Sequence, residues 1–150
     1  MKKAVLGILL AGIVLALPVQ SEAHERQCPK SIEVSYSEAV ELMEIASAEA
    51  GNQGQQGMEL IMSVVLNRVA SPSFPNDIHS VIHQPGQFAT SSMHKVDIPV
   101  EAHLALASIE MGNVTPGIIG FETINSTELD KYFDQDFIYL DHQFYKTKEQ

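Results

Sequence analysis

The sequence predicts a mostly helical α+β protein that ends in a short β-sheet. Apolar residues recur at helical spacing in four segments between residues 36 and 112. Two later runs, residues 118–124 and 137–145, are instead rich in β-branched and aromatic residues and are expected to pair as strands. The chain has 150 residues without an internal repeat or a low-complexity linker, so we expect one compact domain.

The N-terminal segment has the layout of a cleavable secretory signal. Lys2 and Lys3 precede an apolar run over residues 4–17, and Ser-Glu-Ala at residues 21–23 offers a small-residue cleavage site. The apolar run is shorter than the roughly 20 residues that a membrane-spanning helix needs. We therefore expect a signal peptide over residues 1–23, export from the cell, and no stable insertion in the membrane; an uncleaved anchor is the alternative.

Charge and cysteine content narrow the functional classes. The formal net charge of −10 argues against nucleic acid as a partner, because phosphate binding needs clustered Lys and Arg. Cys28 is the only cysteine, so an intramolecular disulfide is excluded. Polar and charged residues precede Cys28, which favours a free thiol or an intermolecular bridge over lipid attachment.

The folded domain is expected over residues 35–150, after a lead-in without periodicity at residues 24–34. Ser35 and Glu38 have the spacing of a capping box, which predicts a helix from Tyr36 to Ala50. At 100° per residue one face of this helix is apolar and should face the core. That face consists of Ala39, Leu42, Met43, Ala46 and Ala50.

Glu49 differs from the other acids of this helix because it lies at the edge of the apolar face, near Leu42 and Ile45. Gly51, Gly54 and Gly57 follow it and are expected to break the helix. A carboxyl in such a place is partly desolvated, which raises its pKa toward the value that a general acid needs. The alternative is a solvated glutamate at an unfavourable end of the helix dipole.

The next two helices follow from patterning and capping residues. Residues 58–70 are apolar nearly all round, which predicts a helix at the centre of the domain. A short helix over residues 78–83 is expected to be capped by Asn76 or Asp77.

A fourth helix is expected between Asp97, as its cap, and Gly112, with Pro99 in the first turn. The acidic stretch over residues 125–136 is expected to be a loop between the two strands.

Two clusters of reactive residue types are alternatives to Glu49 as the functional site. His79 and His83 are four apart, as in zinc sites, but the HExxH pattern is absent, which favours surface or capping histidines and no metal. Ser91, Ser92 and His94 lack the GxSxG elbow of a nucleophilic serine, which favours a polar loop.

Two short motifs offer the side chains that a carbohydrate site uses. PGQF supplies Gln87 and Phe88, and DHQFY supplies His142 and Tyr145. Amides and a phenol can bind hydroxyl and N-acetyl groups, and aromatic rings can stack on sugars. Ordinary core packing is the alternative for the aromatic residues.

Residues 45–145 resemble the catalytic domain of the cell-wall hydrolase family of the spore-cortex lytic enzyme SleB. That family typically carries Glu-Ala-Arg-Gly-Glu, then Gly, an apolar helix ending in Leu-Asn-Arg, then Phe-Pro, Gln-Pro-Gly-Gln-Phe and a closing His-x-Phe-Tyr. The matching residues are Glu49, Ala50, Gly57, Leu66, Asn67, Arg68, Phe74, Pro75, Gln84, Pro85, Gly86, Gln87, Phe88, His142, Phe144 and Tyr145.

The resemblance implies a lysozyme-like catalytic domain that acts on peptidoglycan glycan strands as a lytic transglycosylase, without a cofactor. It places the catalytic acid/base on Glu49. Substrate contacts are expected from Gln87, Phe88, His142, Tyr145 and Gln53. An accessory germination protein is a candidate partner.

The chain departs from the family after Glu-Ala, where Gly51, Asn52 and Gln53 replace Arg-Gly-Glu. A cation and a second carboxylate are therefore absent beside Glu49, and their effects on its pKa oppose each other. Two other functions stay open on the sequence: a non-catalytic peptidoglycan-binding relative, and a metal-dependent N-acetylmuramoyl-L-alanine amidase that would use the histidines.

Overall fold

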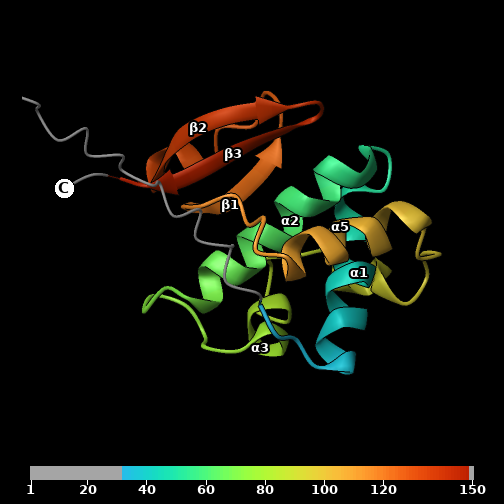
Figure 1. Ribbon diagram of the computed structural model, residues 1–150. Helices are drawn as coiled ribbons and strands as arrows, with labels where there is room; N and C mark the ends of the chain where they lie inside the picture. The colour runs from blue at the N-terminus through green and yellow to red at the C-terminus, as the bar shows by residue number, and fades with distance from the viewer. Residues whose placement is uncertain (1–31, 149–150) are drawn as a thin grey trace, which may run out of the picture.

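The computed structural model describes residues 32–148, so the predicted signal peptide and Cys28 lie outside the described residues. A small sheet packs on one side of a group of helices, and the central helix α2 lies between the sheet and helices α1 and α5 (Figure 1). No helix within residues 32–148 has the length and apolar character needed to cross a membrane. The elements are α1 (Tyr36–Ala50), α2 (Gly54–Val69), α3 (Ile78–Ile82), α4 (Thr90–Met93), α5 (Val100–Glu110), β1 (Ile118–Thr123), the 3₁₀ helix η1 (Leu129–Lys131), β2 (Phe133–Tyr139) and β3 (His142–Thr147).

Helix α1 has the predicted bounds and begins with the predicted capping box. The Glu38 carboxylate accepts from the Ser35 backbone N–H at 2.8 Å, and the Ser35 hydroxyl accepts from the Glu38 N–H at 3.4 Å. Both free amides of the first turn thereby gain partners, which fixes where the helix starts. Leu42, Met43, Ala46 and Ala50 are buried as expected, and Ile45 is buried with them.

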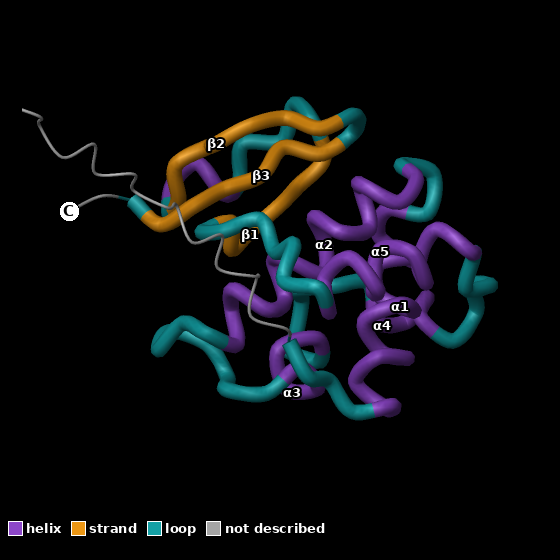
Figure 2. The backbone as a smooth tube through the Cα atoms, viewed as in Figure 1, coloured by secondary structure: helices purple, strands orange, loops and turns teal. Residues whose placement is uncertain are grey.

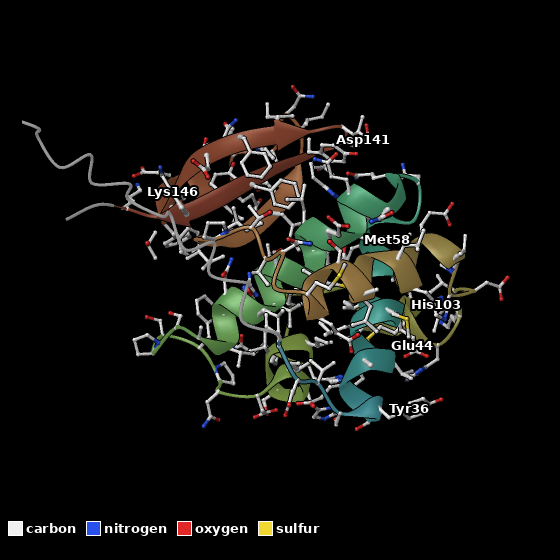
Figure 3. All side chains as sticks on the ribbon, in the orientation of Figure 1. Tyr36, Glu44, Met58, His103, Asp141 and Lys146 are labelled. Atoms are coloured by element: carbon white, nitrogen blue, oxygen red, sulfur yellow. The ribbon has the colours of Figure 1, made fainter. Side chains whose placement is uncertain are left out.

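Helix α2 forms the centre of the domain, as its apolar sequence predicts. Met58 is fully buried, and Figure 3 shows it in the interior, whereas Tyr36 lies at the periphery. The helix starts at Gly54, so the expectation that Gly57 lies outside a helix was wrong. A Cβ on Gly57 would lie 2.4 Å from the Cβ of Gln53, so glycine is needed there for α2 to pass close to Gln53.

The shorter helices agree with the sequence in part. Asp77 caps α3 by accepting from the Ser80 N–H at 2.7 Å, as predicted. Pro99, rather than the expected Asp97, is the N-cap residue of α5, because its extended backbone leads directly into the helix. Helix α4 occupies the segment predicted as a polar loop and lies beside α1, where its one buried side chain, Met93, anchors it (Figure 2).

The sheet is antiparallel with strand order β1-β3-β2. The run over residues 137–145 forms two strands rather than one, because the chain reverses between Tyr139 and His142, with Leu140 in the left-handed conformation (φ 48°). Strand β2 also extends into the stretch predicted as an acidic loop. It is an edge strand with mostly exposed residues, so its sequence lacks a clear apolar alternation. Figure 3 shows Asp141 and Lys146 toward opposite ends of the sheet.

The central position of α2 predicts the effect of a core truncation. Ile61 is fully buried in α2, so Ile61→Ala should lower the free energy of unfolding by about 2–5 kcal/mol, measured by urea denaturation. Leu104→Ala, on the half-exposed face of α5, removes a similar volume and should cost less than about 1 kcal/mol. Equal losses in the two variants would contradict the assignment of α2 as the core helix.

Candidate active site

A cavity of about 300 Å³ opens where the end of α1 meets the sheet. Its walls come from α1, from the loop before α4, and from strands β1 and β3. The lining residues are Glu49, Gly86, Gln87, Phe88, Ala89, Phe121, Glu122, Thr123 and His142.

A second cavity of about 240 Å³ adjoins the first and shares part of its wall, and the two together are called the groove. The shared residues are Gly86, Gln87, Phe121 and Glu122. The second cavity adds Arg68, Ser126, Glu128 and Leu129. A concave site with aromatic walls and a few convergent polar groups is typical of ligand-binding sites.

Glu49 lies in the last turn of α1 and is half-buried at the cavity wall. Burial raises the pKa of its carboxyl, and the Ala89 backbone N–H, which donates to Oε1 at 2.5 Å, only partly offsets that effect. This donor is the one hydrogen-bond partner of the carboxylate among the described residues. The second oxygen is therefore available to a ligand in the cavity.

Arg68 fixes the loop that carries Gln87, Phe88 and Ala89. The Arg68 side chain is buried, donates from Nε to the Ile119 carbonyl at 2.6 Å, and donates from Nη1 to the Gln87 Oε1 at 3.1 Å. Its guanidinium also lies over the Phe74 and Phe88 rings, 5.0 and 5.1 Å from their centroids. Burial lowers the pKa of Arg68 to about 10, so the group stays charged at neutral pH.

Gln87 and Phe88, which the sequence predicts as substrate contacts, both line the cavity. Because Arg68 can only donate, the Gln87 oxygen faces Arg68 and its amide nitrogen remains as a donor for a ligand. The Phe88 and Phe121 rings lie 5.9 Å apart and form an aromatic wall. Nothing in the sequence marked Phe121, because a strand position alone does not show which cavity it faces.

His142 also lines the cavity, and Gln53 supports it from behind. The Gln53 amide nitrogen donates to His142 Nδ1 at 2.8 Å, and Gln53 itself is buried outside the cavity wall. Burial lowers the pKa of His142, which keeps the ring neutral at pH 7. Gln53 is therefore placed to orient His142 rather than to touch a ligand.

Tyr145 is fully buried and does not line either cavity, in contrast to the contact expected from the sequence. Its hydroxyl donates to Glu122 Oε1 at 2.5 Å and lies 2.9 Å from Asp130 Oδ1. Burial and these two carboxylates raise the pKa of Tyr145, so the phenol stays protonated. Its geometry is that of a support for Glu122.

Glu122 is a second carboxylate in the groove, and no local sequence pattern marks it. The Ser126 hydroxyl donates to Oε2 at 2.6 Å, and the Gln143 amide donates to Oε1 at 2.9 Å. Burial acts to raise the pKa of Glu122, but these hydrogen bonds and that of Tyr145 outweigh it and lower the pKa. The cavity thus contains one carboxyl with a raised pKa, Glu49, and one with a lowered pKa.

Other polar residues that were candidates for a functional role lie outside the groove. Ser91, Ser92 and His94 do not line it, and His94 Nδ1 instead lies 3.1 Å from the Glu44 carboxylate. Asn52 donates to Asp141 at 3.1 Å, at the tip of the sheet.

Comparison with known proteins places the chain in a family. The sequence model of the family described as Cell Wall Hydrolase matches residues 52–147, more than half of the chain. No curated protein matches. The chain therefore belongs to the cell wall hydrolase family, which is a class of enzymes.

Two solved structures show the same fold. The catalytic domain of the Bacillus cereus SleB protein is 21% identical, with a TM-score of 0.63 over 78% of this chain and 96% of that domain. The catalytic domain of the germination-specific lytic transglycosylase SleB from Bacillus anthracis is 22% identical, with a TM-score of 0.64 over 75% of this chain and 97% of that domain. The predicted lysozyme-like α+β fold is confirmed.

The two carboxyls should affect stability in opposite ways at pH 7. Glu49 binds its proton more tightly in the folded protein than in the unfolded chain, so its ionisation destabilises the fold above its raised pKa. Glu49→Gln should therefore raise the urea midpoint at pH 7, with the gain disappearing below the ordinary value of 4.5.

Glu122→Gln is the matched control because the pKa of Glu122 is lowered. Ionised Glu122 stabilises the fold above its unfolded pKa, so this variant should lower the midpoint at pH 7, and the loss should shrink as the pH falls through the folded pKa. Midpoint changes of the same sign in both variants would contradict the two assignments.

Proposed function

We propose that this chain is a peptidoglycan lytic transglycosylase that cleaves the glycosidic bond between N-acetylmuramic acid and N-acetylglucosamine, with Glu49 as acid and base. The observation that carries the proposal is the half-buried Glu49 carboxyl in the groove, with its raised pKa and a single backbone donor. Membership of the cell wall hydrolase family supports the substrate class. The family match begins at residue 52, so the role of Glu49 rests on its geometry.

The reaction needs one carboxyl in two successive roles. Protonated Glu49 donates its proton to the glycosidic oxygen, and the bond between that oxygen and C1 of N-acetylmuramic acid breaks. The C6 hydroxyl oxygen of the same sugar then bonds to C1, and its proton returns to the Glu49 carboxylate. The product carries a 1,6-anhydro ring, the carboxyl is restored, and no water is consumed.

Glu122 complements this reaction by keeping a fixed negative charge in the same cavity. Positive charge develops at C1 as the glycosidic bond breaks, and a preorganised carboxylate stabilises it. The three donors around Glu122 hold it ionised and restrict its movement. The chain thus has a second carboxylate in the groove, although Gln53 stands where the family carries one after Glu-Ala.

Binding of the glycan is assigned to Gln87, Phe88 and His142, which line the cavity. The Gln87 amide and the neutral His142 ring offer hydrogen bonds to acetamido and hydroxyl groups without adding charge. Gln53 and Tyr145 act as positioning residues, the first on His142 and the second on Glu122.

The place of action follows from the substrate. Peptidoglycan lies outside the cytoplasmic membrane, which agrees with the signal peptide expected over residues 1–23. The substrate is spore cortex or vegetative wall, and an accessory germination protein is a candidate partner if it is cortex.

Replacement of the catalytic carboxyl tests the proposal. Glu49→Gln should lower the release of soluble muropeptides from purified sacculi and cortex by about 10²–10⁴-fold, because glutamine cannot exchange a proton. Mass spectrometry of the wild-type digest should show 1,6-anhydromuramic ends. Unchanged cleavage by the variant would refute the assignment of Glu49.

The same digest separates the two other functions. A metal-dependent amidase would release peptides rather than disaccharides and would stop in EDTA, whereas glycan cleavage by Glu49 should continue. A non-catalytic relative would sediment with sacculi without releasing soluble products. Either result would replace the transglycosylase proposal.

The role of Glu122 gives a separate prediction. Glu122→Gln keeps the shape of the side chain but removes the fixed charge, so kcat should fall about 10²-fold with little change in KM. Glu110→Gln, at the exposed end of α5, is the control and should have wild-type kinetics. A change confined to KM would show that Glu122 binds the glycan rather than stabilising its transition state.

A further inference from the structure

Three side chains that ligate metals meet on the surface between α1 and α3, outside the groove. Glu41 comes from α1, and His79 and His83 come from α3 and its C-terminal cap. One ligand atom of each lies within 4.8 Å of the others. None of the three lines either cavity, so the cluster is separate from the residues assigned to catalysis.

The two histidine rings lie close enough to each other to bind one metal ion together. They are four residues apart, and their ring centroids lie 4.3 Å from each other. The Glu41 Oε1 atom is 2.8 Å from His79 Nδ1. The short helix α3 thus presents both imidazoles to the same carboxylate of α1, and Figure 1 shows the two helices on the same side of the molecule.

Glu41 has an unused ligand atom. Its Oε2 is buried from solvent and has no hydrogen-bond partner among the described residues, although an isolated carboxylate oxygen is costly to bury. The neighbouring pair of His94 and Glu44 differs, because both carboxylate oxygens of Glu44 lie within reach of His94 Nδ1, at 3.3 and 3.1 Å. The Glu41 carboxylate therefore keeps one oxygen free to bind a metal, whereas both oxygens of Glu44 are engaged by His94.

We propose that Glu41, His79 and His83 bind a zinc ion that links α1 to α3. Two imidazoles and one carboxylate are a ligand set that zinc uses, and a solvent molecule would complete the tetrahedron. Zinc bonds of about 2.0–2.1 Å place ligand atoms about 3.4 Å apart, so the widest separation, which is within 4.8 Å, needs to close by at most about 1.4 Å. The exposed histidines can do this by side-chain rotation, whereas Ca²⁺ and Mg²⁺ prefer oxygen ligands.

The surroundings limit the site to these three side chains. Asp77 precedes α3, but its carboxylate accepts from the Ser80 N–H at 2.7 Å and is occupied as a helix cap. The metal would link α1 to α3 and is not needed for the chemistry assigned to Glu49, because none of its ligands lines either cavity. The inference does not depend on the proposed transglycosylase activity.

Zinc titration of the purified protein tests the site. All proteins carry Cys28→Ser, because a thiolate binds zinc by itself. Calorimetry should show one zinc ion per chain, and 100 µM zinc should raise the melting temperature by about 3 °C or more, whereas magnesium and calcium should not. Cobalt, as a spectroscopic substitute, should give visible absorption bands of tetrahedral intensity.

Variants of the proposed zinc ligands show whether zinc binds at this site. Glu41→Gln and His83→Asn should each weaken zinc binding by about tenfold or more and remove most of the melting shift. His94→Asn removes a histidine that also faces an acid of α1 and should leave both values unchanged. Absence of stoichiometric binding, or binding that persists in Glu41→Gln and His83→Asn, would overturn the proposal.

Discussion

The groove depends on one buried cation, Arg68. Its guanidinium joins α2 to the Ile119 carbonyl of β1, to the Gln87 side chain, and to the faces of Phe74 and Phe88. Removing such a group would leave a buried carbonyl without a donor, which typically costs about 1–3 kcal/mol. More important for function, Arg68 holds the loop whose Ala89 N–H reaches Glu49. The acid therefore has its environment fixed by a residue that never touches it.

The chemistry of the groove follows from two carboxyls in different surroundings. Glu49 has one donor and is partly removed from water, so its proton is held more tightly. Glu122 has three side-chain donors and loses its proton more readily. Opposite shifts of two titratable groups in one cavity are typical of acid–base sites. Burial pushes both pKa values upward, but Glu49 is the more deeply buried of the two and has a single donor, whereas the donors of Glu122 outweigh its burial.

Much of the helical part could be predicted because it depends on local chemistry. The capping box of Ser35 and Glu38 fixes the start of α1, and the apolar circumference of residues 58–70 fixes α2 at the centre. The position of Glu49 at the edge of an apolar face was likewise readable from helical periodicity. Gln87, Phe88 and His142 were predicted because their motifs resemble those of a known family, and all three line the cavity.

The rest depends on contacts between residues far apart in the chain. Glu122 becomes an ionised partner only because β3 brings Gln143 and Tyr145 beside it. The same pairing removes Tyr145 from the surface, which no local pattern shows. Residues 133–136 look like an acidic loop, yet they form an edge strand because β3 offers them backbone partners. Tertiary pairing overrides local preference in both cases.

The most direct test of Glu49 chemistry is digestion of peptidoglycan in H₂¹⁸O followed by mass spectrometry of the muramic ends. Attack by the sugar's own C6 hydroxyl incorporates no solvent oxygen, so the wild-type products should be anhydro ends without the label. Newly formed muramic ends that are reducing rather than anhydro would show that water attacks C1, and would contradict the proposal that a single carboxyl closes the ring.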